Sequence, residues 1–142
     1  MRDLVSNIGF AVAIPVAVYA ADTTPVALDL LGFNSALIEL HVGVGGITFD
    51  GTNKVEFVLT HSVDGVTYNA IADKDVQGVT GTVNGIIKSL IAAHAAADIT
   101  KVGYVGSCRY LKLKAHFSGT HGTGTAMAAS LVKSSASLRP VA

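Results

Sequence analysis

The sequence predicts an all-β fold, an antiparallel β-sandwich of jelly-roll type with about eight strands and little helix. Two observations lead to this prediction. Apolar and polar residues alternate with a period of two in several segments, which is typical of half-buried antiparallel strands. Turn segments rich in Gly, Asn and Asp separate these stretches. A chain of 142 residues can bury its own core, so we expect one sandwich domain over residues 1–142.

The first predicted strand lies in the apolar stretch GFAVAIPVAVYAAD, residues 9–22. Large side chains occupy the even positions from Phe10 to Val18, and alanines and Pro15 occupy the odd positions between them. This alternation indicates a strand with one crowded face and one shallow face. Because proline cannot donate a ladder hydrogen bond, Pro15 places the strand near the edge of a sheet.

A secretion signal is the alternative interpretation of this stretch, because Arg2 precedes the apolar run and residues 18–20 resemble a cleavage site. However, Asp3 offsets the charge of Arg2, and Pro15 interrupts the apolar run. The core of a signal peptide is also apolar all round and does not show a two-residue alternation. The run is also shorter than the roughly 20 apolar residues that cross a bilayer. We therefore expect a strand and no membrane association. Residues 1–8 are the candidate for an extended N-terminal arm that pairs with a neighbouring subunit.

Three later segments show the clearest alternation, with apolar residues on one face and mostly polar residues on the other. The three apolar sets are Ala36, Ile38, Leu40 and Val42; Val55, Phe57 and Leu59; and Leu111, Leu113, Ala115 and Phe117.

Turn and end signals complete the strand assignment. Asp64-Gly65 predicts a hairpin, because this pair is favoured where a tight turn needs positive φ.

Residues 84–98 allow a helix with Asn84 as its N-cap, but the neighbouring isoleucines favour a strand. We expect a strand from Gly85 to Ile91, followed by a loop or short helical turn. The small residues of MAASLVKSSASL, residues 127–138, supply the last strand.

Charge is scarce and unevenly distributed. Half of the residues are apolar and 14% are charged, which suits a surface that packs against other proteins. All ten acidic residues lie at or before Asp98, and the segment after Asp98 carries only basic charges. Strands from the two segments can interleave and neutralise each other within one sandwich. The alternative is two oppositely charged surfaces that guide docking and self-association.

The residues that carry chemistry do not form a recognisable site. The sequence contains five histidines without a metal-ligand spacing, no GxSxG nucleophile motif, and Cys108 as its single cysteine. Basic residues are too few, and aromatic residues too sparse, for a nucleic-acid platform. We therefore expect no enzymatic activity, catalytic residue, cofactor, metal or nucleic-acid partner.

The most distinctive segment runs from Val102 to Gly124. Tyr104 and Tyr110 flank a Gly106-Ser107 turn, and Arg109 beside it can stack on a tyrosine and donate to backbone carbonyls. This pattern indicates a structural corner, with a partner-contact hot spot as the alternative. The candidate partner contacts are Arg2, Pro15, Tyr104, Arg109 and Tyr110.

Four stretches together resemble a family of small virion proteins of tailed bacteriophages. These stretches are MRDLVSNIGFAVAIPVAVYAAD, the Gly32-Phe33 turn, HSVDGVTY, and VGYVGSCRYLKLKAHFSGTHG. Some members of the family are jelly-roll cement, or decoration, proteins on the capsid exterior. The resemblance carries no functional residue with it, because the shared motifs are structural.

The resemblance implies a protein made in the host cytoplasm that binds the outside of the phage head. Its partners would be the major capsid protein, whose subunits it bridges to stabilise the shell, and further copies of itself in a dimer or higher homo-oligomer. A β-sandwich of a head fibre or tail is an alternative. A carbohydrate-binding jelly roll for host attachment is another, although a chain with no Trp, four Tyr and five Phe offers few rings for stacking on sugars.

Overall fold

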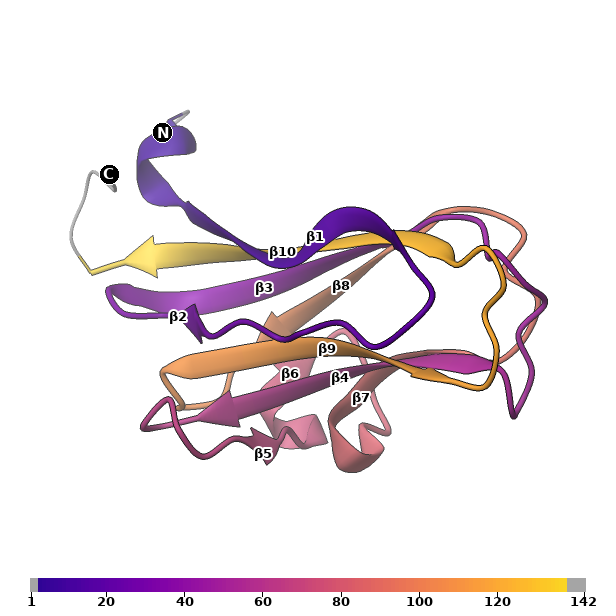
Figure 1. Ribbon diagram of the computed structural model, residues 1–142. Helices are drawn as coiled ribbons and strands as arrows, with labels where there is room; N and C mark the ends of the chain where they lie inside the picture. Colours follow the sequence, from indigo (N-terminus) through magenta and orange to yellow (C-terminus); the bar gives the residue numbers. More distant parts are fainter. Residues whose placement is uncertain (1–2, 138–142) are drawn as a thin grey trace.

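Two antiparallel sheets pack face to face in the computed structural model, which describes residues 3–137 (Figure 1). The first sheet consists, in spatial order, of β1 (Gly9–Tyr19), β10 (Thr125–Ala136), β3 (Phe33–Val42), β8 (Asp98–Tyr104) and β6 (Val76–Gln77). The second consists of β2 (Leu28–Asp29), β9 (Tyr110–Ser118), β4 (Lys54–Ser62) and β5 (Asn69–Ala70), with β7 (Ile86–Leu90) also paired to β4. Three single 3₁₀ turns are η1 (Val5–Asn7), η2 (Asp73–Asp75) and η3 (Val83–Gly85).

The strand order is that of a jelly roll. Without the two-residue strands β5 and β6, the sheets read β1-β10-β3-β8 and β2-β9-β4-β7. Apart from β4 to β7, each of these strands connects to a strand in the opposite sheet, which generates two nested Greek keys. The predicted fold class is therefore confirmed. The count of ten strands within the described residues exceeds the expected number because β5 and β6 add short pairings at sheet edges.

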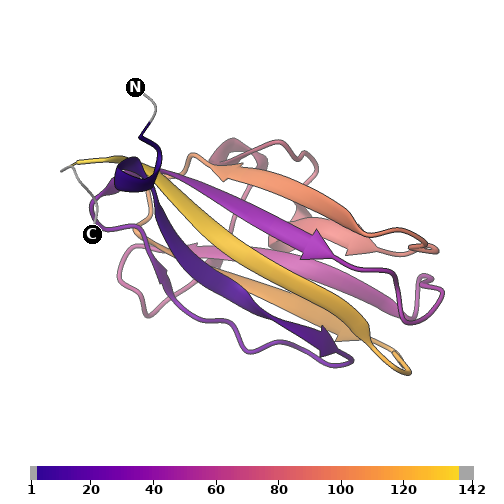
Figure 2. The ribbon, with the colours of Figure 1, turned by 90° about the horizontal axis from the view of Figure 1, so that it is seen from above.

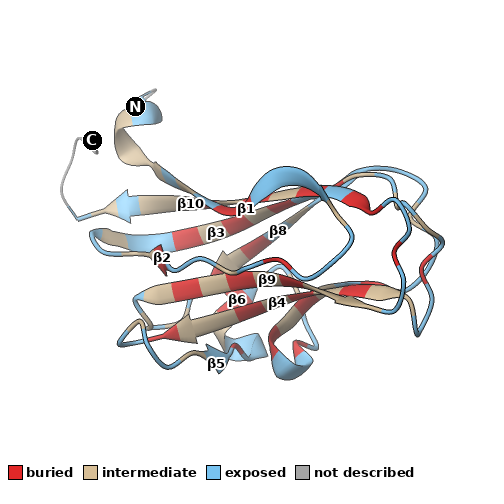
Figure 3. Cartoon of the chain, viewed as in Figure 1, coloured by how far each residue is buried: buried red, intermediate tan, exposed pale blue. Residues whose placement is uncertain are grey.

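The core lies between the two sheets, and red bands mark the buried residues in strands of both sheets (Figure 3). The predicted alternation is confirmed in β3, β4 and β9, because their apolar sets face this core. Phe117 differs in being only partly buried, since it lies near the end of β9, against His121. The largest fully buried side chains are Phe57, Ile14, Ile38, Leu40, Leu59, Leu111, Leu113 and Leu131.

The β4–β5 connection confirms the predicted hairpin but replaces its tight turn with a longer loop. Gly65 has the expected positive φ of 74°, whereas Asp64 is not among the residues with positive φ. The Asp64 carboxylate instead accepts hydrogen bonds from the backbone N–H groups of Val66 and Thr67 at 2.9 Å. The side chain therefore organises a loop from residue 63 to residue 68 before β5 begins.

The ambiguous segment after Asn84 forms a strand, as predicted. β7 pairs with β4, and the alanine-rich stretch after it is a loop up to β8. Asn84 has a left-handed φ of 54° and lies in the middle of the η3 turn, so it does not cap a helix.

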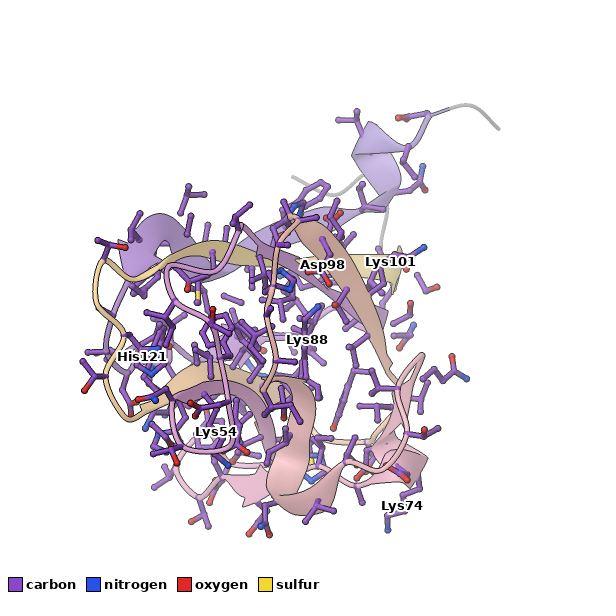
Figure 4. The ribbon with its side chains drawn as sticks, turned by 90° about the vertical axis from the view of Figure 1, so that its right-hand side faces the viewer. Lys54, Lys74, Lys88, Asp98, Lys101 and His121 are labelled. Carbon is purple, nitrogen blue, oxygen red and sulfur yellow. The ribbon has the colours of Figure 1, made fainter. Side chains whose placement is uncertain are left out.

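Acidic and basic residues pair between neighbouring segments of the fold. Arg109 binds Asp29 at 2.7 Å and Lys114 binds Asp22 at 2.6 Å, in each case joining the basic C-terminal segment to the acidic N-terminal one. A further ion pair between Lys88 of β7 and Asp98 of β8, both labelled in Figure 4, links the two sheets. These contacts support the interpretation in which interleaved strands neutralise each other.

Candidate interaction surface

Strand β1 exposes most of its large apolar side chains. Phe10 is 65% exposed, Val12 61%, Val16 88% and Val18 63%. The alanines at positions 11 and 13 lie on the inner side, where Ala13 is buried. The alternation predicts a crowded face of even-numbered residues, and the structure places that set outward except for Ile14, which is buried.

Two β-bulges around Pro15 produce this arrangement. The register between β1 and β10 shifts between Val12 and Ile14, and again between Ile14 and Ala17. A bulge inserts an extra residue and so changes which face the next side chain takes. Ile14 therefore points into the core, with 1% exposure, while the even-numbered valines on both sides of it point outward.

Neighbouring strands extend the exposed apolar surface. Directly paired residues share one face of a sheet, and Phe10 pairs with Val132, which pairs with Leu37. Val18 pairs with Ala126, and Ala128 pairs with His41, which pairs with Ile99. We call this surface the outer apolar face, and its members are Phe10, Val12, Val16, Val18, Leu37, Ile99, Ala126, Ala128 and Val132. Monomeric proteins seldom expose contiguous apolar surface of this kind without using it for contacts.

Two open hollows lie on the outer apolar face. One has a volume of about 640 Å³ and reaches toward Ile99, and the other has about 590 Å³ and reaches toward Val12 and Pro15. Val16, His41 and Ala128 line both hollows. His41 lies within 3.5 Å of Glu39, so the polar groups gather toward β3 while the β1 side stays apolar.

Tyr104, Arg109 and Tyr110 form the corner that the sequence indicates. The Tyr104 hydroxyl accepts a hydrogen bond from the backbone N–H of Cys108 at 3.1 Å and lies 2.9 Å from Nδ1 of His61. Burial raises the pKa of the Tyr104 phenol. Because Tyr104 is only 5% exposed, its side chain holds the corner from inside and is not a surface contact.

Arg109 closes the same corner from outside. Its guanidinium stacks over the Tyr110 ring at 4.8 Å from the centroid, as the sequence suggests. It donates to both oxygens of the Asp29 carboxylate, at 2.8 and 2.7 Å, where backbone carbonyls were expected as acceptors. These hydrogen bonds from Arg109 lower the pKa of Asp29 to about 2. A cleft of about 360 Å³ adjoins the corner between Leu30 and Arg109.

The structure brings only part of the predicted contact set to one surface. Pro15 lies on β1 at the sheet edge, as predicted, and borders the outer apolar face. Tyr104, Arg109 and Tyr110 cluster at the corner, away from that face. Arg2 lies outside the described residues. The N-terminal segment that was expected to be extended contains the η1 turn, in which Val5 is exposed.

Sequence reasoning did not single out the residues that dominate the surface, namely Phe10, Val12, Val16 and Val18. The period-two pattern was the signal that could have found them, but it does not say which face points outward. The bulges that decide this depend on pairing with β10.

The described residues hold no cluster suited to metal chemistry. No group of three or more His, Cys, Asp and Glu side chains among residues 3–137 could hold an ion. Across the same residues, no helix has the length and apolarity needed to cross a bilayer.

Comparison with known proteins adds a structural likeness. No protein-family model matches the chain, and no curated protein matches it. A solved chain from Bacillus endospore appendages, described as a novel family of disulfide-linked pili, is similar over 92% of this chain and 90% of its own length. The two share 12% identity at a TM-score of 0.40.

Proposed function

We propose that this protein is a structural virion protein, a capsid cement protein that binds the outside of a phage head and bridges major capsid protein subunits. The observation that carries the proposal is the outer apolar face, which has the exposed apolar character expected of an interface. The resemblance of the sequence motifs to phage virion proteins is the reason for naming a phage head as the location and the major capsid protein as the partner. The proposal includes no enzymatic role.

The mechanism is thermodynamic. A subunit that binds the assembled shell but not free capsid protein stabilises the shell by mass action. Contacts that are weak at one subunit add up over a repeated lattice, because each copy restrains its neighbours. An apolar face suits this task, since it stays attached at ionic strengths that screen surface charges.

Sugar binding receives less support than protein binding. Within residues 3–137, Phe10 is the only exposed Phe or Tyr side chain, whereas a sugar platform uses several exposed rings. A protein surface is therefore the better-supported partner.

The proposal is tested by adding purified protein to capsids that lack it. We expect saturable binding and a higher temperature of capsid disruption. Val16→Glu introduces a charge into the centre of the outer apolar face and should weaken binding by about tenfold or more, because burying a valine is worth about 1.5–3 kcal/mol.

Val66→Glu is the matched control, since Val66 is 82% exposed in the β4–β5 loop and lies outside the face. It should bind like the unmodified protein. Equal binding by both variants, or no binding by the unmodified protein, would refute the proposal.

A further inference from the structure

Strand β1 is a long, open sheet edge. It pairs with β10 on one side and ends the first sheet on the other, as Figure 2 shows from above. It has 11 residues, and no Asp, Glu, Lys, Arg or His lies between Gly9 and Tyr19. An unprotected edge of this kind is a template for pairing with another strand.

The other edge strands of the sandwich are short. β2, β5 and β6 have two residues each, and β7 has five. Charged residues also lie at two of these edges. Asp29 in β2 is bound by Arg109, and the η2 turn beside β6 contains Asp73 and Asp75. Short length and charge both discourage strand addition. β1 alone among these described edges has neither feature.

Pro15 limits how much of β1 can pair. It has no N–H to donate, and its carbonyl oxygen already accepts the Tyr19 hydroxyl at 2.8 Å. The two bulges also make the strand irregular beyond Val12. The regular part is therefore Gly9 to Val12, which pairs with Lys133 to Ser130 of β10 in continuous register.

We propose that the segment Gly9–Ala13 pairs antiparallel with the same segment of a second copy of this chain, with Ala11 on the two-fold axis. An isologous contact is symmetric, and directly opposite residues share one face of a sheet, so the axis must pass through a residue. An axis at Phe10 would set Val12 opposite Ile8, which lies outside β1, whereas an axis at Ala11 keeps every pair within β1. The dimer joins two first sheets into one continuous sheet. This inference goes beyond the proposed function and does not require the partner to be a capsid.

The side chains fit this register. Phe10 lies opposite Val12 of the partner subunit, and by symmetry the pair occurs twice on the same outer face. Cross-strand pairs of an aromatic and a β-branched residue stabilise antiparallel sheets. Gly9 lies opposite Ala13 of the partner subunit, where both residues are small. Self-pairing also requires a segment without charge, because like charges opposite each other destabilise a sheet.

The dimer changes the binding surface as well as the edge. Pairing at β1 brings two outer apolar faces side by side on one continuous sheet. A partner lattice would then meet two linked copies of the surface, which raises its apparent affinity through effective concentration.

A disulfide tests the register directly. Residues directly opposite in an antiparallel pair have Cα atoms about 4.5–5.5 Å apart, which falls within the range that disulfides bridge. We expect Ala11→Cys, in a Cys108→Ser background, to form a cross-linked dimer on mild oxidation. Ala17→Cys in the same background is the control, because Ala17 is exposed on the same strand but lies beyond Pro15. Equal cross-linking at both positions, or none at Ala11→Cys, would overturn the proposal.

Charge variants test the same register without oxidation. Phe10→Lys/Val12→Lys places like charges opposite each other, and Phe10→Glu/Val12→Lys places opposite charges there. Both remove the same two apolar side chains, so folding and apolar burial are matched. We expect the dimer dissociation constant of the Lys/Lys variant, from sedimentation equilibrium, to exceed that of the Glu/Lys variant about tenfold or more. Equal constants for the two variants, or an unmodified protein that stays monomeric at sub-millimolar concentration, would contradict the pairing.

These measurements use the isolated protein, so they separate the two proposals. A dimer that fails to bind capsids removes the capsid proposal and leaves the dimer. A monomer that binds capsids removes the dimer and leaves the capsid proposal.

Discussion

Close backbone approaches explain why particular glycines occur where they do. A Cβ atom at Gly46 would lie 1.8 Å from the carbonyl oxygen of Gly124, where two loops meet at one end of the sandwich. Gly124 also has a positive φ of 78°, a conformation that side chains disfavour. At Gly51, by contrast, a Cβ atom would meet nothing within 4 Å.

We predict that Gly46→Ala lowers the free energy of unfolding by about 1–3 kcal/mol, because the loops must move apart. Gly51→Ala should be neutral or raise that free energy by up to about 1 kcal/mol, since it restricts the unfolded chain. Chemical denaturation of both variants measures the difference. Similar losses for the two would show that the contact at Gly46 does not exist in solution.

Asp29 should make part of the stability depend on pH. Its folded-state pKa of about 2 lies below the ordinary value of 3.8, because Arg109 donates hydrogen bonds to its carboxylate. A depressed pKa stabilises the fold above the ordinary pKa, and this contribution is lost as the pH falls from about 4 toward 2. The pair is partly exposed, so the effect is modest.

We predict that Asp29→Asn is less stable than the unmodified protein at neutral pH, and that the difference shrinks as the pH falls through this window. Denaturation curves at a series of pH values test this. A difference that is independent of pH would contradict the role of the ionised carboxylate.

At the scale of elements, the two bulges of β1 separate core from surface within a few residues. Without them, all the large even-numbered residues would share one face. With them, Ile14 packs inside while Val16 remains outside.

We predict that Ile14→Ala lowers the free energy of unfolding by about 2–5 kcal/mol. Val16→Ala should change it by less than about 0.5 kcal/mol. Urea denaturation distinguishes these outcomes. A large loss for Val16→Ala in the isolated protein would place that side chain in a core or an interface.

The corner at Tyr104 joins β8 to β4 and to the turn before β9. Tyr104→Phe removes the hydroxyl that accepts a hydrogen bond from the backbone N–H of Cys108 and lies 2.9 Å from Nδ1 of His61. We predict a loss of about 1–3 kcal/mol, because buried polar groups lose their partner. Thermal unfolding measures it, and an unchanged midpoint would mean that water replaces the hydroxyl.

At the scale of the whole molecule, the last strand in sequence occupies a central position in the first sheet. β10 lies between β1 and β3 and pairs with both along most of its length. Neither neighbour can complete its hydrogen bonds until the chain has been made through β10.

We predict that a chain ending at Gly124 has no cooperative unfolding transition, because loss of β10 splits the first sheet between β1 and β3. Circular dichroism with increasing denaturant would detect this. A sigmoidal transition in the truncated chain would show that the remaining strands re-pair.

Sequence patterns predict the fold of this protein well and its surface poorly. The alternations around Ile38, Phe57 and Leu113 identify the inward faces correctly. Most residues at the intervening positions are polar and face outward, so only the apolar residues can face the core. In β1 both faces are apolar, so the same rule predicts a strand but not its orientation. Arg109 was predicted to stack on a tyrosine, and it does so, but its acceptor Asp29 lies 80 positions away in the chain and had no local signal.

By itself, the sequence determined the class of fold, most of the strands, the inward faces of β3, β4 and β9, and the position of β1 at an edge. These follow from local rules, since the period of side chains and the missing N–H of proline act within a few residues. Only the tertiary structure decided that Phe10 and the nearby valines of β1 face solvent. It also decided that Tyr104, Arg109 and Tyr110 lie at a corner away from the outer apolar face. The register against β10 sets the bulges, and register between strands far apart in sequence depends on the packing of the whole sandwich.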